Sequence, residues 1–558
     1  MFTKVKGYHK WTSYSSLPIT LQLQITSYPK EERGEITGYQ LVIGYEKHLG
    51  TDVEELKDKL FYLNSQLKDN EIYVIWTDNL PAIKGFFRDV ITGVFPPDSK
   101  RDFLYITLYN HLEFRDYTLW NKELTSTKTC EWWNVEIKRL YKEVFIPDKN
   151  YYLTPTQIVK KRLKKECSDT LCKEIFPSNL EEYNQLRKFL YGGLVYCAYP
   201  KVDFDDDMLL VDMTSAYIFG WLCQPHIIEK EHRVDPSTWK DYLYNEEYAT
   251  EGIYDIKFHC STTKIKCYKT ITGFHLNRDA NIKDEESGGY YKELQHKIVA
   301  LNNVDLQLFL DLCDNIEEIK CLSLKVAKVG KIPKDIAKVL ADEYLKKQIL
   351  PSNSEARRVQ KVKLLSMYGL TIIKCNEDDF SRKRKEAVVP PQWGVWTTSY
   401  VKRQIFNLGN TLEGWRYTDT DCLLVKDTPE NRKQIEEFNK GIQERVKEAC
   451  EYYDLNFQDM KYLGRFKLEH EIVRMKALAT KEYMFTTKEG EFIVKAAGCD
   501  KQKLKEYDDL YDRDMIPTGD RIQWEITNDS YYEWVVKEED YKNFLEFQLL
   551  LLNYLSSI

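Results

Sequence analysis

Asp419 and Asp421 lie two residues apart in the stretch from Trp415 to Val425, and apolar residues flank them on both sides. This pattern predicts a β-hairpin with both acids at its tip, and residues two apart on a strand share a face. Two hard oxygen ligands in one place suit Mg²⁺, the usual partner of substrate phosphates. The alternative is a solvated turn, because aspartate favours turns in any protein.

Three further groups of residues along the chain also have side chains that could take part in chemistry. Asp212 ends the apolar strand from Met208 to Val211, and Ser215 and Tyr217 come directly after it. The two later groups are Lys361, Ser366, Tyr368 and Gly369, and then Lys481, Glu482 and Tyr483. Upstream of all of them, the pair Gly192 and Gly193 permits a close backbone approach, although a tight turn alone would also explain it.

The elements that must position these residues follow from hydrophobic periodicity. The N-terminal part alternates strand-like and helix-like segments, which predicts an α/β layer: strands at 19–26, 37–45, 71–76 and 104–108, and helices at 53–67 and 83–91. Residues 146–188 look like a polar linker with a basic helix, whose run of lysines is either a solvated face or a nucleic-acid contact. Helical patterns dominate 294–350, a basic helix is expected at 354–368, and strand patterns dominate 393–425 and 462–494.

Composition places the chain among ordinary globular proteins. It has 558 residues, of which 43% are hydrophobic and 30% charged, and its 13 cysteines are scattered without metal-binding spacing, as in a reduced intracellular protein. No signal peptide is expected, and the apolar C-terminal segment 544–558 is too short for a membrane span, so we expect a packed helix there and a cytoplasmic protein without a membrane partner. The formal net charge of −7 argues against an overall basic nucleic-acid binder but leaves room for a basic groove.

Taken in order, these groups resemble the motifs of family B DNA polymerases, and in particular the protein-primed branch encoded by small tailed phages and linear plasmids. Asp212 to Tyr217 matches Asp-x-x-Ser-Leu-Tyr, and Lys361 to Gly369 matches Lys-x₃-Asn-Ser-x-Tyr-Gly. Tyr417 to Cys422 matches Tyr-x-Asp-Thr-Asp-Ser, and Lys481 to Tyr483 matches Lys-x-Tyr. The resemblance covers residues 189 to about 500, where Asn303-Val304-Asp305-Leu306 also looks like a landmark of the branch's first terminal-protein region.

The resemblance implies a DNA-directed DNA polymerase that adds deoxynucleotides to a 3′-hydroxyl by two-metal phosphoryl transfer. It makes Asp212, Asp419 and Asp421 the catalytic acids, with Asp212 and Asp421 as ligands of two Mg²⁺ ions for which Mn²⁺ can substitute. The implied nucleotide-binding residues are Tyr217, which would exclude a 2′-hydroxyl, Arg357, Lys361 and Tyr368. The implied DNA-binding residues are Ser215, Gly192, Gly193, Thr420, Lys481 and Tyr483. For Tyr217 and Tyr368, a plain core-aromatic role is the alternative.

The architecture implied by the family has two parts. Residues 1–188 would form an α/β exonuclease-like domain of the RNase H type, and residues 189–558 an α+β right-hand polymerase. In that hand, the palm would be 189–280 and 393–498, a terminal-protein-region insertion and the fingers 281–392, and the thumb 499–558. The expected partners are primer-template DNA, deoxynucleoside triphosphates and a terminal or priming protein, in the host cytoplasm if a phage encodes the chain.

The sequence departs from the family most clearly in the N-terminal part. The acids of the family's 3′–5′ exonuclease are replaced at Gln22 and Gln24, at Trp76 and Leu80, and at Val135. Amides lack the charge of a two-metal site, and Leu and Val cannot bind metal, so we expect an exonuclease-like fold without exonuclease activity. Asp78 and Glu136 keep the alternative open if the alignment shifts by one or two residues.

Smaller departures lie in the polymerase motifs, and none removes a metal ligand. Leu365 stands in place of Asn, Cys422 in place of Ser, Ile218 in place of a common Pro, and Tyr191 is displaced by one residue from the family's Tyr-x-Gly-Gly. The branch's strand-displacement insertion has only residues 376–387 left to occupy, so it looks shortened or absent.

Two other functions fit these observations. The first is template-independent or protein-primed synthesis in a specialised repair or defence role. The second is a non-catalytic nucleic-acid-binding scaffold, which the three acids oppose.

Overall fold

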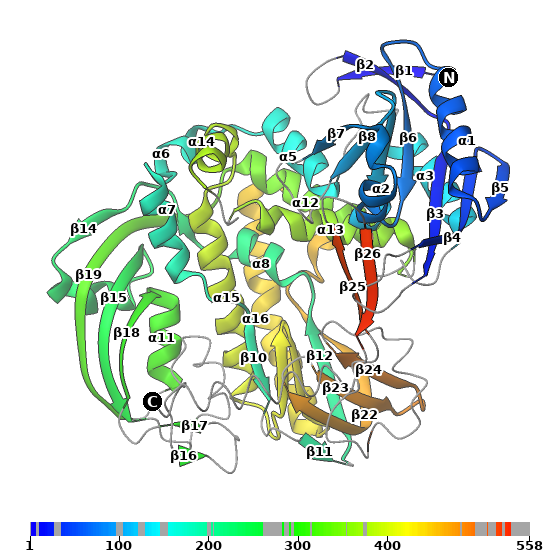
Figure 1. Ribbon diagram of the computed structural model, residues 1–558. Helices are drawn as coiled ribbons and strands as arrows, with labels where there is room; N and C mark the ends of the chain where they lie inside the picture. The colour runs from blue at the N-terminus through cyan, green and yellow to red at the C-terminus, as the bar shows by residue number, and fades with distance from the viewer. Residues whose placement is uncertain are drawn as a thin grey trace, which may run out of the picture. The chain divides into compact units, whose positions relative to one another are not determined.

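The computed structural model (Figure 1) describes residues 2–6, 11–26, 35–95, 104–120, 129–145, 154–197, 202–204, 206–259, 282–283, 290–291, 295–312, 315–352, 354–371, 376–479, 482–496, 511, 521–526 and 531–536. Its contacts divide the chain into two compact units. The first unit comprises 1–158, 353–362 and 518–558, and the second comprises 159–352 and 363–517.

The first unit is built on a mixed sheet with the strand order β5-β4-β3-β6-β9-β8-β7. Its strands are β3 (Ile19–Thr26), β4 (Glu35–Ile43), β5 (Glu46–Gly50), β6 (Glu71–Thr77), β7 (Ile91–Phe95), β8 (Tyr105–Leu108) and β9 (Leu112–Asp116). The central pairs β3–β6 and β6–β9 are parallel and the outer pairs antiparallel. An α/β layer was predicted for this part of the chain, and the sheet confirms it.

Helices connect and cover this sheet. α1 (Val53–Ser65) begins after Asp52, whose side chain accepts a hydrogen bond from the amide of Glu54, and it carries the chain across to β6. The helix expected at 83–91 lies earlier, as α2 (Leu80–Phe86), because the Asn79 side chain caps it, and a short 3₁₀ turn then leads into β7. α3 (Cys130–Leu140) packs Trp133 and Ile137 beneath Trp76.

The C-terminal part of the first unit contributes one hairpin, β25 (Arg521–Ile526) with β26 (Tyr531–Val536), which contacts α2. The N-terminal strands β1 (Phe2–Lys6) and β2 (Trp11–Ser15) pair with each other, and β2 also pairs with β6. The helix expected at 544–558 lies outside the described residues. None of the described helices combines the length and the apolar composition needed to span a bilayer.

The second unit contains an antiparallel sheet with the strand order β10-β20-β21-β12-β22-β23-β24, to which β11 adds beside β22. Its strands are β10 (Leu194–Cys197), β11 (Val202–Phe204), β12 (Met208–Met213), β20 (Tyr417–Thr420), β21 (Cys422–Lys426), β22 (Phe466–Ala479), β23 (Glu482–Thr487) and β24 (Phe492–Ala496). β12 is fully apolar from Met208 to Val211, because it lies between β21 and β22 and is buried on both faces.

Three helices pack together beside this sheet. α15 (Pro391–Gly409) and α16 (Pro429–Tyr453) both contact α8 (Ala216–Cys223) (Figure 1). The prediction of strands over 393–425 is therefore wrong for the stretch that forms α15. Pro391 opens this helix, and nearly every side chain along it is buried, so its aromatic and β-branched residues read as a strand.

A second antiparallel sheet of this unit has the order β13-β19-β15-β18, with β14 beside β19. The long strands are β15 (Tyr248–His259), β18 (Gln295–Asn302) and β19 (Asn315–Gly330), and the short ones β13 (His226–Ile227) and β14 (His232–Val234). The helical pattern expected over 294–350 is wrong for β18 and β19. It holds for α11 (Asn303–Leu312) and α12 (Lys334–Ile349).

The remaining helices of this part of the chain lie close to where they were predicted. The polar linker holds α5 (Pro155–Glu166), which is the expected basic helix, then α6 (Thr170–Ile175) and α7 (Leu180–Leu186). The second basic helix is α13 (Glu355–Gly369), and α14 (Glu377–Glu386) occupies the segment left for the insertion.

Candidate active site

The predicted hairpin exists, and its tip is a tight turn around Thr420. The amide of Asp421 donates a hydrogen bond to the carbonyl of Asp419 at 2.8 Å, and Thr420 between them has a φ of +66°. Asp419 is therefore the last acid of β20, while Asp421 is in the turn itself, so the two do not share a strand face as their spacing suggested. The turn, rather than strand alternation, brings these two residues together.

Gly193 makes this turn possible from the neighbouring strand. β10 pairs with β20 so that Leu194 faces Thr420, and a Cβ on Gly193 would lie 2.7 Å from Cγ2 of Thr420 and 3.0 Å from its Cα. Only glycine leaves room for that approach. At Gly192, by contrast, a Cβ would meet nothing within 4 Å, so the glycine there has no packing explanation.

Asp212 reaches the same place from the other side of the hairpin. In the β12–β21 ladder it lies opposite Cys422, and the next amide, that of Met213, donates to the carbonyl of Asp421 at 2.8 Å. Burial raises the pKa of the Cys422 thiol to about 12, and the charges of Asp421, Asp212 and Asp419 add to that rise. The three acids predicted from sequence therefore surround one buried side chain.

The backbone after Asp212 turns sharply into α8. Thr214 exchanges hydrogen bonds with the loop before β22, through the carbonyl of Arg465 and the amide of Gly464. Ser215 then adopts a left-handed conformation, with φ +52° and ψ +50°, and α8 starts at the next residue. Lys347 of α12 donates a hydrogen bond to the Ser215 hydroxyl at 2.9 Å. Lys347 could not be predicted from the sequence, because only the fold brings α12 beside this turn.

Tyr217 and Tyr368 form a stacked pair. Their ring centroids lie 4.5 Å apart at an interplanar angle of 23°, and the Tyr368 hydroxyl shares a hydrogen bond with Thr398 at 2.8 Å. Burial raises the pKa of both hydroxyls, and for Tyr217 the nearby Tyr368, Asp421 and Asp419 raise it further. Both rings therefore stay neutral at physiological pH, next to the acids.

Tyr483 lies beneath the hairpin. It is buried on β23, its ring centroid is 4.9 Å from that of Tyr417, and Lys495 of β24 lies over its other side at 5.5 Å. Burial raises the pKa of its hydroxyl to about 12, against the opposing charge of Lys495. In this position Tyr483 supports the strand that carries Asp419. Its motif partner Lys481 lies outside the described residues.

Arg357 and Lys361 are placed with the first unit. They are one turn apart on the N-terminal part of α13, where Arg357 is half-buried and Lys361 exposed. Two residues later, Lys363 belongs to the second unit and pairs with buried Glu343 at 2.9 Å. Leu365, which replaces the motif's Asn, is 48% exposed. The second unit thus brings together the three acids, Ser215, Thr420 and the two tyrosines, but not Arg357 and Lys361.

The acids supply oxygen ligands suited to a hard cation. Asp212 and Asp421 lie at adjoining strand ends and are partly exposed, and a pair of carboxylates acting with substrate phosphates is how Mg²⁺ is usually bound. Across the described ranges, no group of three or more His, Cys, Asp or Glu side chains is arranged to hold a metal by itself. The carboxylates of Asp212 and Asp421 are of the type that binds Mg²⁺ together with substrate phosphates.

Two positions of the expected nuclease site in the first unit, Trp76 and Leu80, are occupied by buried packing residues. Leu80 lies in the core, and Trp76 is buried with its indole nitrogen donating to the Tyr141 hydroxyl at 3.1 Å. Gln24 is exposed, whereas Gln22 donates to Asp78 at 3.4 Å. Burial raises the pKa of Asp78, although the hydrogen bond from Gln22 opposes that rise.

On α3, the residue that faces β3 is not the expected one. Val135 is 65% exposed and points away from the sheet. Its neighbour Asn134 is buried and donates to the carbonyls of Pro18 and Val42 at 2.9 and 3.2 Å. The adjacent acid, Glu136, pairs with Arg139 at 2.9 Å. The sheet-facing residue is thus also an amide.

No protein-family model and no curated protein matches the sequence. Among solved structures, Phi29 DNA polymerase complexed with primer-template DNA aligns with a TM-score of 0.65 at 14% identity, covering 93% of this chain and 99% of that chain. Its ternary complex with primer-template DNA and incoming nucleotide substrates gives 0.61 at 14% identity, covering 93% and 98%. The complex with single-stranded DNA gives 0.64 at 13% identity, covering 93% and 100%. The chain therefore shares the fold of Phi29 DNA polymerase over nearly its whole length.

Proposed function

We propose that this chain is a DNA-directed DNA polymerase that extends a 3′-hydroxyl with deoxynucleotides. The observation that carries the proposal is the convergence of Asp212, Asp419 and Asp421, in a chain with the fold of Phi29 DNA polymerase. Asp212 lies opposite Cys422, the amide of Asp419 donates to the Cys422 sulfur at 3.4 Å, and the amide of Met213 donates to the carbonyl of Asp421 at 2.8 Å. Primer-template DNA and incoming nucleotides, which are bound in the solved Phi29 complexes, are the substrates we infer here. In this proposal residues 189–280 and 393–498 form the palm, 281–392 the terminal-protein-region insertion and the fingers, and 499–558 the thumb.

The acids would act by holding divalent cations next to the substrate phosphates. Asp212 and Asp421 would hold two divalent cations, and such ions neutralise a triphosphate and orient the attacking and leaving oxygens in line. Asp419 would be the third essential acid, held by the turn that also positions Asp421. Phosphoryl transfer needs positioning and electrostatic stabilisation more than covalent help, so a rigid turn suits this role.

The surrounding residues would bind the nucleotide and the primer. The neutral Tyr217–Tyr368 stack offers an apolar surface for the sugar and the new base pair, and Thr398 fixes its outer ring. Lys347 places a positive charge at Ser215, beside the acids, where a phosphate would be attracted. Arg357 and Lys361 are proposed to hold the triphosphate once substrate is bound.

We further propose that the chain lacks proofreading. The positions of the family's nuclease acids are filled by amides and apolar side chains, and the carboxylates nearest to them, Asp78 and Glu136, are each engaged by neighbouring side chains. Two metal ions held only by amides would lack the negative charge that keeps them in place.

Primer extension with Mg²⁺ tests the polymerase proposal. Asp212→Asn and Asp421→Asn keep the shape of each side chain and remove its charge, so extension should fall by at least ~100-fold, corresponding to about 2.7 kcal/mol of lost transition-state stabilisation. Glu437→Gln, which neutralises an exposed acid on α16, should leave the rate unchanged. Extension that persists in both aspartate variants would refute the proposal.

The same assay on four homopolymer templates distinguishes the related functions. Incorporation of only the complementary nucleotide supports templated synthesis, whereas incorporation that ignores the template supports a template-independent enzyme. Nucleic-acid binding without any extension would support the scaffold function.

A further inference from the structure

Glu343 of α12 is an almost fully buried acid that no function considered so far uses. Three basic side chains from three helices surround it. Lys363 of α13 lies 2.9 Å away and Lys346 of α12 lies 3.6 Å away, and Arg162 of α5 donates a hydrogen bond to it. A carboxylate stays charged in a buried place only where cations pair with it. Glu343 therefore joins α13 to α12 at a fixed point.

The same helix also reaches the turn that follows Asp212. Lys347 lies one helical turn after Glu343, on the same face of α12. It donates to the hydroxyl of Ser215 at 2.9 Å, and Ser215 is the left-handed residue after which α8 begins. Tyr217 lies in the first turn of α8. One face of α12 thus contacts both α13 and the segment that carries Tyr217.

These contacts form a closed ring around the tyrosine pair. From Glu343 the ring passes to Lys363 and then along α13 to Tyr368, which stacks on Tyr217 with ring centroids 4.5 Å apart. From Tyr217 it returns to α12 through the hydrogen bond at the start of α8. A shift of α13 along α12 would break a buried ion pair, so the ring fixes the spacing of the two tyrosines.

The far end of α13 has a separate anchor on α14. Lys383 of α14 donates to the carbonyl of Thr371 at 2.9 Å. Thr371 in turn donates from its amide to the carbonyl of Tyr368 at 3.0 Å. Tyr368 is therefore supported on both sides, by the Glu343 contact before it and by α14 after it.

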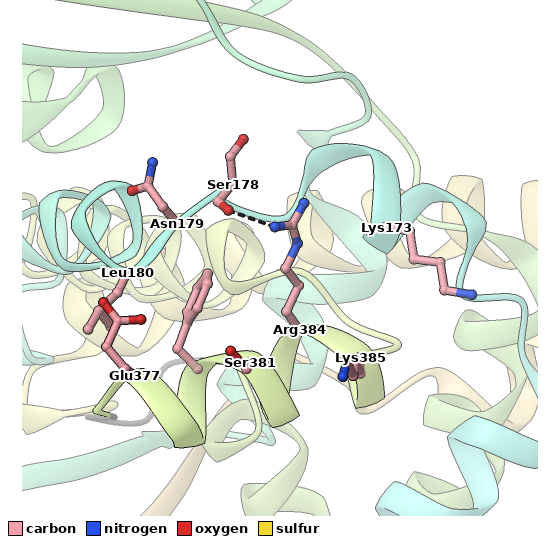
Figure 2. A pocket seen from close by; sticks show the side chains of 9 residues that line it. Lys173, Ser178, Asn179, Leu180, Glu377, Ser381, Arg384 and Lys385 are labelled. Atoms are coloured by element: carbon pink, nitrogen blue, oxygen red, sulfur yellow. Dashed lines mark hydrogen bonds between the residues drawn. The ribbon is translucent and has the colours of Figure 1, made fainter.

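α14 itself is held firmly in the second unit. Phe380 forms an aromatic cluster with Phe176 and Tyr183, in which its ring centroid lies 6.0 and 5.8 Å from theirs, and all three rings are buried. Arg384 donates to the carbonyl of Ser178 at 2.6 Å, as Figure 2 shows. Loss of the Glu343 contact would therefore release α13 on one side only, so that Tyr368 shifts against its partner ring without being detached.

We propose that Glu343 is a positioning residue for selection of the nucleotide sugar. By fixing α13 against α12 through Lys363, it holds Tyr368 on Tyr217 and keeps the space beside the sugar too small for a 2′-hydroxyl. A pocket with apolar walls rejects an added hydroxyl through its shape, so a small movement of one wall changes the selection. This role rests on the proposed polymerase function, in which Tyr217 contacts the sugar.

The test measures primer extension with deoxynucleotides and with ribonucleotides, and compares Glu343→Gln with Asp342→Asn. Asp342 is a matched control, because it pairs with two of the same cations, Arg162 and Lys346, and its loss leaves the Lys363 contact in place. Glu343→Gln should lower the ratio of the two kcat/KM values about tenfold, mainly through a lower KM for ribonucleotides. The kcat for deoxynucleotides should change by less than about threefold, since the three acids are untouched. Asp342→Asn should leave the ratio unchanged.

A second variant removes the same contact from the other helix. Lys363→Met leaves Glu343 paired with Arg162 and Lys346, so the buried carboxylate keeps partners. It should lower the ratio as much as Glu343→Gln, and the double variant Glu343→Gln/Lys363→Met should lower it no further, because both changes break one contact. Partial unfolding cannot imitate this result, since the fraction of folded protein cancels in a ratio of two rates measured on one sample.

The outcomes separate this role from the polymerase proposal. If the wild-type chain extends primers but the ratio is unchanged in Glu343→Gln and Lys363→Met, the positioning role is overturned and the polymerase proposal stands. An equal loss of selection in Asp342→Asn would also overturn the role, because removal of any acid from this part of α12 would then suffice. If the wild-type chain extends no primer, the polymerase proposal fails and the positioning role fails with it.

Discussion

Thr420 is a β-branched residue in a backbone conformation that such residues avoid. A φ of +66° is unfavourable for threonine, and conformations of this kind cost about 1–3 kcal/mol unless the surroundings impose them. Here Gly193 lies so close to Thr420 that a Cβ on the glycine would be 3.0 Å from the Thr420 Cα and 2.7 Å from its Cγ2. The Thr420 hydroxyl also donates to Asp419 at 3.0 Å. The strain therefore falls between the two acids whose positions matter most for the proposed chemistry.

Replacing Gly193 tests the importance of this contact. Gly193→Ala places a methyl group 2.7 Å from Thr420 and should lower the free energy of unfolding by about 1–3 kcal/mol and the extension rate by about tenfold or more. Gly192→Ala is the matched control, since its methyl group meets nothing within 4 Å, and should change stability by less than ~0.5 kcal/mol. Urea unfolding and single-turnover extension measure the two quantities. Equal behaviour of the two variants would show that the contact does not position the acids.

The acids themselves could be predicted from sequence because motif spacing records them directly. The residues that hold them could not. Lys347 lies 132 residues from Ser215 along the chain, and nothing in its local pattern marks it. The alignment selected Val135 instead of its neighbour Asn134, which is the buried residue. Sequence alone could not decide between the two, because buried and exposed residues can be neighbours on a helix.

At the scale of elements, α11 and α15 are joined by a row of polar contacts. Asn302 donates to the Ser399 hydroxyl at 2.8 Å, and Trp396 donates to Asn303 at 3.2 Å. One turn further along α15, Lys402 forms an ion pair with Asp305 at 2.7 Å, and both side chains are almost fully buried. The sequence landmark at 303–306 thus has a structural role, since its side chains fix α11 onto α15.

Breaking this ion pair should be costly. Lys402→Met leaves the Asp305 carboxylate buried without its partner and should lower the free energy of unfolding by about 3–5 kcal/mol, whereas the double variant Lys402→Met/Asp305→Leu should recover most of that loss. Lys426→Met, which breaks an exposed pair with Glu413, is the control and should cost less than ~1 kcal/mol. Urea unfolding followed by tryptophan fluorescence gives all three values. A single variant as stable as the control would contradict the argument.

Elements with a clear face could be predicted well, and fully buried elements could not. The strand at Ile19–Thr26 has the predicted bounds, and α1 and α13 differ only at their ends. α15 was missed because burial on nearly all sides removes the periodicity that distinguishes a helix from a strand. β19 was missed because Ile316 and Ile319, three residues apart, imitate a helical stripe.

At the scale of the whole molecule, the first unit has a mixed sheet with covering helices, in which Leu80 and Trp76 add apolar packing at positions where acids were expected. This explains why the fold aligns with Phi29 DNA polymerase over 93% of the chain although the identity is 14%. The fold depends on the burial pattern, which tolerates exchange of the residues that carry chemistry.

This leads to a prediction for the wild-type chain. With a 3′-mismatched primer and either Mg²⁺ or Mn²⁺, hydrolysis should stay at the level of Asp78→Asn and Glu136→Gln variants, because Gln22 and Arg139 already contact these carboxylates and we propose that neither binds a metal. Gel analysis of the primer measures the release of nucleotides. Cleavage that exceeds these variants and survives Asp419→Ala would show that the first unit is an active nuclease.

α14 is held by Phe380 in the aromatic cluster, by Lys383 on Thr371, by Arg384 on the carbonyl of Ser178 and by Glu386, which pairs with Lys160. The exposed side chains of Asp378 and Ser381 make none of these contacts. For protein engineering, residues 377–386 therefore form an exchangeable cassette. A longer segment grafted there with Phe380, Lys383, Arg384 and Glu386 retained would add new surface without disturbing the tyrosine pair.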